Sequence, residues 1–179
     1  VPGVAMNEIT ATMSNGTLTR NGDLWVARPN KIGNDAVITV SAATANGTQQ
    51  MGAMTFRVRK LPDPSPFIAI KDASGNTVNY KGTPKRISKG SLMAATGLGA
   101  ALDDDLLNIS YSVVSFTTVF FDSMGNAMPE VSEGAKFSSR QMEQFKRLKP
   151  GKSFFITNVK AKGPDGITRD ISPMEVALN

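Results

Sequence analysis

The side chains of this sequence that could do chemistry are acidic, basic and hydroxyl groups, because the chain contains neither histidine nor cysteine. Histidine is the usual general base and the commonest zinc ligand, and a cysteine thiolate is the other frequent zinc ligand and nucleophile. Their absence excludes Ser-His and Cys-His catalytic arrangements, disulfides and thiolate metal sites. We therefore expect a protein that is not an enzyme and that holds no metal or cofactor.

The acidic and hydroxyl groups give little evidence of a metal site or a catalytic site. Asp103, Asp104 and Asp105 could contact a hard cation, but three consecutive carboxylates diverge and no spaced calcium-binding set follows, which favours a solvated loop. A lysine-activated serine often shows Ser-x-x-Lys spacing, which the sequence lacks. No glycine-rich phosphate-binding motif occurs either.

Basic side chains form two groups that could meet an acidic partner. They are Lys85, Arg86 and Lys89, and then Arg140, Lys146, Arg147, Lys149 and Lys152. The formal net charge of +5 would assist such a contact. Since no aromatic platform is interleaved with these groups, we do not expect nucleic-acid binding. A solvated charged surface is the plain alternative.

Residues 1–60 predict an antiparallel β-sandwich, with strands around 9–13, 24–28, 36–42 and 53–59. Three dipeptides that suit hairpin turns separate them, namely Asn15-Gly16, Asn21-Gly22 and Asn46-Gly47. Immunoglobulin-like sandwiches usually have about 100 residues. We therefore expect this domain to lack its first strand or strands, or to be completed by a partner chain. The chain opens on Val1, and we expect it to be a piece of a longer protein.

A run of prolines follows the last of these strands. Proline fixes its own φ and removes a backbone donor, so residues 61–66 predict a stiff linker that is neither helix nor central strand. We take this linker as an interdomain hinge between domains 1–60 and 67–179. Its hinge residues are Leu61, Pro62, Asp63, Pro64 and Pro66.

Residues 67–179 predict a second β-rich domain with one or two short helices. Ser88 and Ser138 have the spacing of helix N-caps, for a short helix over 89–96 ended by Gly97 and for a helix over 139–149. The longest strand, 107–121, is apolar on both faces and is expected at the centre of a sheet covered on both sides. The predicted fold class is mainly β, with two immunoglobulin-like β-sandwich domains in tandem.

Four strings of the sequence are distinctive when taken together. They are Phe56 to Pro64 (FRVRKLPDP), Gly134 to Gln141 (GAKFSSRQ), Leu148 to Gly151 (LKPG) and Val159 to Pro173 (VKAKGPDGITRDISP). These strings resemble the C-terminal periplasmic region of the GldM/PorM family, the gliding-motility and type IX secretion core protein of Bacteroidetes. The resemblance covers most of the chain and is strongest from Met51 onward. By general look it is closer to the PorM branch.

The resemblance implies an elongated, homodimeric periplasmic shaft that transmits force and has no catalytic residues. An upstream membrane helix would anchor it and pair with an inner-membrane partner of the GldL/PorL type. Its last domains would contact outer-membrane-associated ring proteins of the GldK/GldN (PorK/PorN) type. The alternative from another class is a ligand-binding β-sandwich, carbohydrate-binding or adhesin-like, in which Trp25, Tyr80 or Tyr111 stacks on the ligand. For Trp25, a place in the core is the favoured interpretation.

Overall fold

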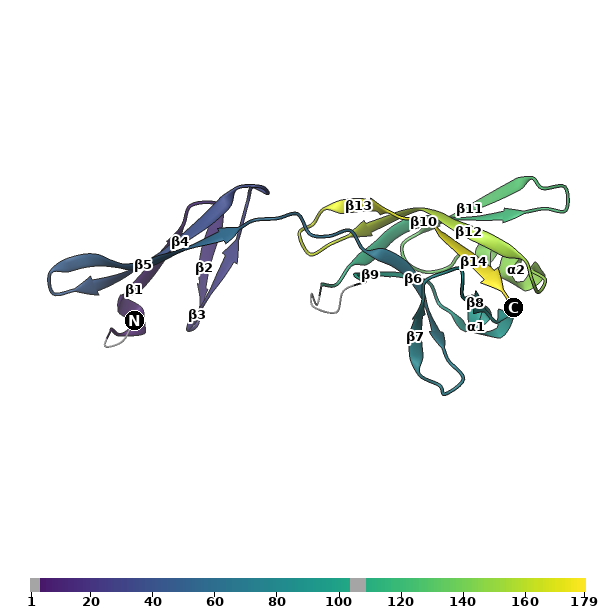
Figure 1. Cartoon of the computed structure of the whole chain (residues 1–179), viewed down its shortest axis with the longest axis horizontal. Coiled ribbons are helices and arrows are strands. Elements are labelled where there is room, and N and C mark those ends of the chain that lie inside the picture. Colours follow the sequence, from purple (N-terminus) through teal and green to yellow (C-terminus); the bar gives the residue numbers. More distant parts are fainter. Residues whose placement is uncertain (1–3, 104–108) are drawn as a thin grey trace. The chain divides into compact units, whose positions relative to one another are not determined.

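The computed structural model describes residues 4–103 and 109–179. The chain divides into two compact units, Val1–Leu61 (unit 1) and Pro62–Asn179 (unit 2), each built mainly from β-strands (Figure 1). The predicted fold class, mainly β with short helices in the second domain, is confirmed. The predicted linker, 61–66, overlaps the first residues of unit 2.

Unit 1 contains two antiparallel sheets. One has the strand order β1-β4-β5, and the other is the hairpin β2-β3. The elements are the 3-10 turn Met6–Glu8, β1 (Ile9–Met13), β2 (Thr17–Asn21), β3 (Leu24–Arg28), β4 (Asp35–Thr44) and β5 (Gly47–Arg57).

Two of the three predicted Asn-Gly hairpin turns are present. Gly22 (φ +60°) lies between β2 and β3, and Gly47 (φ +101°) begins β5 directly after the turn from β4. The third prediction is wrong, because Asn15-Gly16 joins β1 to β2, which lie in different sheets. Asn15 is buried, and its amide nitrogen donates to the carbonyl of Lys31 (2.9 Å) while its amide oxygen accepts from the Lys31 N–H (3.0 Å).

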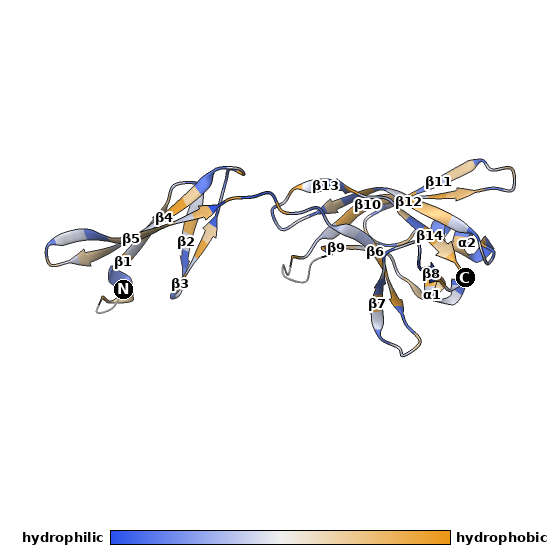
Figure 2. Cartoon of the chain, viewed as in Figure 1, coloured by the Kyte–Doolittle hydropathy of each residue, from blue (hydrophilic) through white to orange (hydrophobic). Residues whose placement is uncertain are grey.

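Few apolar side chains of unit 1 are enclosed. Among its described residues, the buried hydrophobic ones are Ile9, Ala36 and Ala42, all of them in β1 and β4. Strand β5 is exposed at every position, and Figure 2 shows hydrophobic stretches on strands of this unit. The described part of unit 1 therefore leaves an apolar sheet face uncovered.

Unit 2 contains a six-stranded and a three-stranded sheet. The first has the order β11-β10-β12-β14-β8 with β13 on β12, and the second has the order β7-β6-β9. The elements are β6 (Ser65–Lys71), β7 (Thr77–Tyr80), β8 (Arg86–Ile87), α1 (Lys89–Ala94), β9 (Leu98–Ala101), β10 (Ser112–Phe121), β11 (Ala127–Glu133), α2 (Ser139–Arg147), β12 (Ser153–Lys162), β13 (Thr168–Ile171) and β14 (Met174–Leu178).

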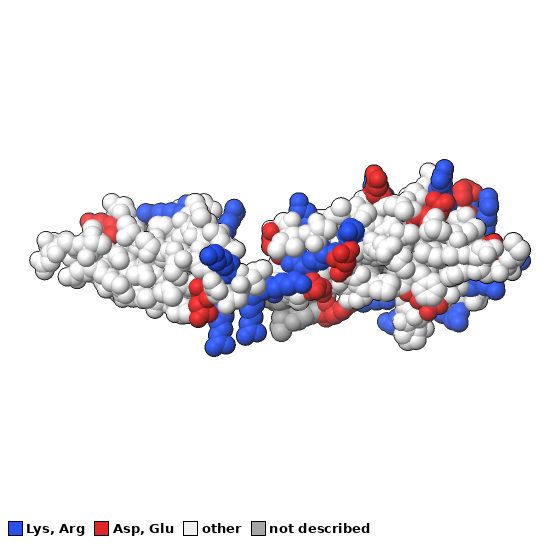
Figure 3. All heavy atoms as spheres, turned by 90° about the horizontal axis from the view of Figure 1, so that it is seen from above, with Lys and Arg blue, Asp and Glu red and all other residues white. Residues whose placement is uncertain are grey.

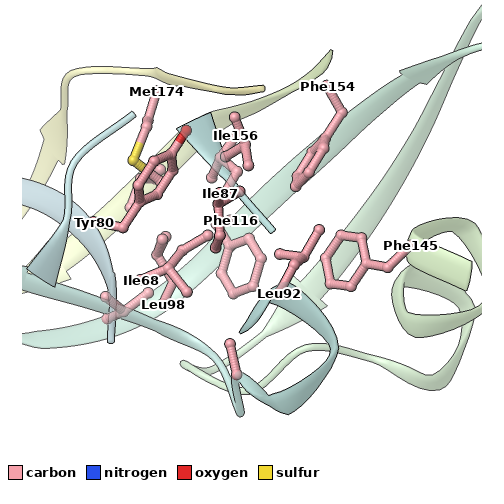
Figure 4. Close-up of a cluster of buried hydrophobic side chains, with 14 of the residues drawn as sticks. Ile68, Tyr80, Ile87, Leu92, Leu98, Phe116, Phe145, Phe154, Ile156 and Met174 are labelled. Atoms are coloured by element: carbon pink, nitrogen blue, oxygen red, sulfur yellow. The ribbon is translucent and has the colours of Figure 1, made fainter. Parts of the chain in front are cut away.

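The core of unit 2 lies between these sheets and the two helices. Figure 4 shows Ile68, Leu92, Phe116, Phe145 and Ile156 converging from separate elements. Aromatic rings fill its helix side, with the stacked pair Phe120 and Phe154 at 4.9 Å between centroids and Phe145 at 5.1 Å from Phe154. Burying one such ring stabilises the fold by roughly 2–3 kcal/mol, so this cluster holds α2 against the sheet.

Strand β10 lies between β11 and β12, so the central position predicted for it is confirmed. Its predicted start is not observed, because β10 begins at Ser112 and residues 104–108 lie outside the described part of the chain. The prediction that both faces are covered is wrong. Phe116 and Phe120 are buried on one face, but Phe121 is 49% exposed on the other.

Both predicted N-caps are confirmed. The Ser88 hydroxyl accepts from the Ser91 N–H at the start of α1, and Ser138 forms a capping box with Gln141 at the start of α2. Gly97 does not end α1, which stops at Ala94. Gly97 instead bridges to Lys136, and a Cβ there would lie 2.1 Å from the carbonyl oxygen of Ala135, so the close approach of two segments requires glycine.

The predicted linker is wrong at its C-terminal end. Ser65 and Pro66 are part of β6, and Pro66 pairs with Ala100 of β9. Strand β7 joins the other side of β6 only from Ile68 onward. The missing N–H of Pro66 therefore removes no ladder hydrogen bond on that side, which is why a strand tolerates proline there.

Candidate interaction surfaces

Seven of the eight basic residues singled out in the sequence lie close together in unit 2, around the ends of α2 and β14. We call them the basic end. They are Lys85, Arg86, Lys89, Lys146, Arg147, Lys149 and Lys152. All seven are exposed, and Figure 3 shows Lys and Arg side chains, with acidic ones between them, at the end of unit 2 where α2 lies.

Hydrogen bonds explain why segments distant in sequence meet at the basic end. The guanidinium of Arg86 donates to the carbonyl of Leu178 (2.8 Å), and the Leu178 N–H donates to the carbonyl of Lys152 (3.0 Å). Strands β8 and β14 pair in parallel, with Arg86 opposite Ala177. The C-terminal strand thus connects the segment at 85–86 to the segment that follows α2.

Helix α2 is held at both ends. At its start the side chain of Gln141 accepts from the Ser138 N–H (2.9 Å), and at its end the ammonium of Lys89 donates to the carbonyls of Lys146 (2.6 Å) and Leu148 (3.0 Å). A cation at a helix C-terminus also suits the helix dipole. Lys89 therefore has a structural role within the basic end.

Arg140, the eighth basic residue, lies in the first turn of α2 and not at the basic end. Together with Arg147 it lines a shallow groove along α2 that also contains Glu130 and Glu143. Glu143 forms an ion pair with Lys146 (2.6 Å), and the hydrogen bond from that ammonium lowers the pKa of the Glu143 carboxyl. This groove is mixed in charge, whereas Lys85, Lys149 and Lys152 form no ion pair with any described residue.

The predicted hinge residues do not form one uniform linker. Pro64 and Pro66 are buried in unit 2, Leu61 is half-buried, and Pro62 and Asp63 are exposed. Asp63 Oδ1 lies 3.3 Å from Nε of Arg169, a β13 residue that is 5% exposed. Arg169 was not among the residues predicted from the sequence. The available signal was its place in an alternating strand, on the face that also carries the buried Ile171.

Unit 1 contains a hollow of about 500 Å³. Trp25 of β3, Met13 of β1 and Phe56 of β5 are among the side chains that line it. Trp25 is half-buried, so it is neither enclosed in a core nor fully open. Its side chain therefore lines the hollow while part of it stays accessible to solvent.

The two tyrosines are committed to other contacts. Tyr80 is 4% exposed; its hydroxyl donates to the carbonyl of Lys85 (2.9 Å) and accepts from the Ala177 N–H (3.3 Å), and burial raises its pKa. The Tyr111 hydroxyl donates to the carbonyl of Pro62 (2.6 Å). Neither ring is arranged to stack on a ligand.

A strip of apolar side chains lies on the outer face of the six-stranded sheet. Val131 is 62% exposed, and the rings of Phe121 and Phe155 meet edge to face at 6.2 Å. The register places Val119 beside Pro129 and Phe155. This strip is the second exposed surface of unit 2 that differs from an ordinary solvated face.

The acidic run offers no metal site within the described residues. Asp103 accepts hydrogen bonds from Lys81 and from the Ser65 hydroxyl (2.5 Å), and the bond from Lys81 lowers its pKa. Asp104 and Asp105 lie outside the described residues. In residues 4–103 and 109–179, no group of three or more acidic side chains is placed to hold a metal ion.

No helix in the described part of the chain has the length and apolar character needed to cross a membrane.

The two units correspond to two successive family models. Residues 1–59 match the model described as the GldM third domain, and residues 62–179 match the model described as the GldM C-terminal domain. No curated protein matches the chain.

Proposed function

Because the chain belongs to the GldM family, a component of gliding motility and type IX secretion, we propose that it is a structural, force-transmitting part of the periplasmic shaft of that machinery. GldM proteins are membrane-anchored periplasmic components, and we place this chain in the periplasm on that basis. The observation that carries the proposal is the order of the two matches, in which a third domain is followed directly by a C-terminal domain.

We propose that the C-terminal unit contacts outer-membrane-associated ring proteins of the GldK/GldN type through the basic end. Its exposed cations, gathered from three segments, suit an acidic protein surface. The inner-membrane partner of the GldL/PorL type would meet a region upstream of this chain.

A pull-down with purified ring proteins tests this contact. The variant Lys85→Glu, Lys149→Glu, Lys152→Glu reverses three charges that form no ion pair with described residues. A matched control reverses three exposed lysines of unit 2 outside the basic end, Lys71, Lys136 and Lys162. We expect the first variant to lose the ring proteins and the control to keep them. Equal capture by both variants would contradict the proposal.

A parallel homodimer is part of the same proposal. The exposure of Met54 (64%) and Phe56 (46%) on β5, an edge strand of the described sheet, supports coverage of unit 1 by another chain segment. Analytical ultracentrifugation of the full periplasmic region checks this, with a dimer as the expected species. A monomer at all concentrations tested would rule the homodimer out.

A second candidate function, favoured by the hollow beside Trp25, is ligand binding by unit 1. Aromatic side chains at such a hollow stack on sugar rings in binding modules. Tryptophan fluorescence during titration with a panel of oligosaccharides distinguishes the two functions, because Trp25 is the only tryptophan of the chain. A saturable change that Trp25→Phe abolishes would favour the binding module, and no change would favour the shaft.

A further inference from the structure

We propose that Arg169 fixes Pro62 and Asp63 to unit 2, so that a joint between the two units begins before Pro62 instead of extending to Pro66. Three side chains carry this proposal: Arg169, Asp165 and Tyr111. We call them the latch. They come from β13, from the turn before β13 and from the segment before β10. The proposal uses only contacts within unit 2, so it stands or falls independently of the proposed function.

Arg169 is the centre of the latch. Its guanidinium is almost completely buried, and a buried charge is stable only when it is paired and hydrogen-bonded. Its Nη1 donates to Asp165 Oδ1 (3.1 Å) and to the carbonyl of Ile167 (3.1 Å), and its Nη2 donates to Asp165 Oδ2. This two-pronged contact fixes the plane of the guanidinium.

The remaining nitrogen of the guanidinium points toward the start of unit 2. Nε lies 3.3 Å from Asp63 Oδ1, within ion-pair distance but without favourable hydrogen-bond geometry. Asp63 is therefore the second carboxylate beside a buried cation. Because Nε is buried and donates no hydrogen bond to any described residue, Asp63 is the group placed to compensate its charge.

Tyr111 adds a contact to the preceding residue. Its hydroxyl donates to the carbonyl oxygen of Pro62 (2.6 Å), and its ring centroid lies 5.8 Å from Cζ of Arg169. An arginine at this distance from an aromatic ring is stabilised by the ring quadrupole. One buried cation thus organises contacts to two consecutive residues, Pro62 through Tyr111 and Asp63 directly.

Gly163 shows how tightly the latch is packed. A Cβ at this position would lie 2.8 Å from Nη1 of Arg169, 2.9 Å from Asp165 Oδ1 and 3.1 Å from Cε1 of Tyr111. These distances are shorter than ordinary van der Waals contact, so any larger residue would displace the latch. The backbone of the β12–β13 turn and the three side chains therefore form one closely fitted group.

Backbone ¹⁵N relaxation on the full chain tests the proposal. We expect the amide of residue 63 to have an order parameter near the rigid value of about 0.85, like those of β6, and Tyr111→Phe or Asp63→Ala to lower that value toward about 0.6. The amides of β6 beyond Ser65 should not change. Asp170→Asn is the matched control, because it removes an exposed ion pair with Lys160 on the same pair of strands.

Two results would overturn the proposal. One is an Asp63 amide in the unaltered chain that is far more mobile than β6, and the other is an unchanged Asp63 order parameter in both Tyr111→Phe and Asp63→Ala. Both variants keep Arg169 and its hydrogen bonds to Asp165, so they test the contacts with Pro62 and Asp63 without removing the buried cation. Gly163→Ala, which adds one methyl group, should loosen the same residues as Tyr111→Phe.

Discussion

Asp63 Oδ1 lies 3.3 Å from Nε of Arg169, where the first residues of unit 2 meet strand β13. The two partners differ in exposure, with 3% of the arginine side chain and 51% of the aspartate side chain accessible to solvent. An exposed carboxylate can be rehydrated when its partner is removed, but a buried guanidinium cannot. Changes to the latch should therefore depend on which side of the pair is altered.

Arg169→Met should lower the free energy of unfolding of unit 2 by about 2 kcal/mol, because hydrogen bonds to charged groups and a cation–aromatic contact are lost. The magnitude stays below that of a fully buried pair because Asp165 and Asp63 reach solvent. Urea unfolding followed by circular dichroism measures it. The control Lys160→Met loses only the exposed pair with Asp170 and should change stability by less than about 0.5 kcal/mol.

The latch should be insensitive to pH near neutrality and should weaken in acid. The hydrogen bond from Arg169 lowers the pKa of Asp165. A carboxyl group with a lowered pKa in the folded state stabilises the fold fully above its unfolded pKa, about 3.9, and loses that contribution as pH falls through the lower folded value. The stability difference between the unaltered chain and Asp165→Asn should be constant from about pH 7 to pH 5 and shrink below about pH 4.

Thermal unfolding of both proteins across this pH range checks the prediction. The charged and titratable groups facing Asp165 are Arg169, Tyr111 and, across the guanidinium, Asp63. Repeating the series with Asp63→Asn added to the unaltered protein and to Asp165→Asn removes the titration of the second carboxylate. A difference that already shrinks between pH 7 and pH 5 would contradict the prediction.

Gln141 should be more important for stability than its place in a capping box requires. It is fully buried, and besides accepting from the Ser138 N–H its side chain donates to the carbonyl of Glu130 in β11 (3.0 Å). Gln141→Ala removes the acceptor of the Ser138 N–H and one donor to the Glu130 carbonyl, which keeps the Thr118 hydroxyl (3.3 Å) as a donor, and should cost about 2 kcal/mol. Gln141→Glu keeps the acceptor for the Ser138 N–H but loses the donor to the Glu130 carbonyl. Its stability should lie between those of the unaltered protein and Gln141→Ala.

The matched control for Gln141 is Gln144→Ala, on the same helix and only partly buried. Its cost should stay within about 0.5 kcal/mol. Chemical denaturation measures the free energy of unfolding of Gln141→Ala, Gln141→Glu and Gln144→Ala. Equal stability of Gln141→Ala and Gln144→Ala would show that the contact with β11 contributes little.

The prolines of the predicted hinge should differ in effect. Pro62 is exposed, so Pro62→Gly should leave the melting temperature of unit 2 nearly unchanged. Pro66 is buried in β6 opposite Ala100, so Pro66→Gly removes packing and adds unfolded-state entropy, and should destabilise unit 2 by about 1–2 kcal/mol. Differential scanning calorimetry measures the melting temperature of unit 2 in the two variants. A mechanical test of the joint that alters Pro66 would therefore also weaken unit 2 itself.

Binding to ring proteins through the basic end should depend on salt. Exposed charges are screened over about 10 Å at 0.1 M ionic strength. We expect affinity to fall as salt rises, and the variant Lys85→Glu, Lys149→Glu, Lys152→Glu to bind on the order of tenfold more weakly with a flatter salt dependence. Surface plasmon resonance at several salt concentrations measures both. Salt-independent binding would point to an apolar surface such as the strip around Phe121.

Local patterns in the sequence were sufficient for β1, β3, β4 and parts of β5 and β10, for the turns at Gly22 and Gly47, and for both helix caps, but they did not predict β2 or β11. The capping box at Ser138 is an example, because it depends on residues three positions apart. The second bond of Gln141 could not be predicted in this way, because it depends on β11 lying beside α2. Asn15 was misassigned for the same reason, since its partner Lys31 belongs to a loop that only the fold brings near.

The contact between Asp63 and Arg169 also could not be predicted from local patterns. Asp63 and Arg169 belong to two of the four strings that carried the family resemblance, and no spacing rule connects residues so far apart in sequence. Composition did predict two basic groups, and the fold brings most of them to one end of unit 2 through β14. Their contact with ring proteins stays a prediction.

The unequal enclosure of apolar side chains in the two units has a thermodynamic consequence. Unit 2 closes around a continuous cluster, whereas the buried hydrophobic residues described in unit 1 are Ile9, Ala36 and Ala42. Heating should therefore give two transitions, the lower one from unit 1. By linkage, anything that binds the open face of folded unit 1 raises the lower transition and leaves the upper one in place. A melting curve thus becomes an assay for whatever covers that face.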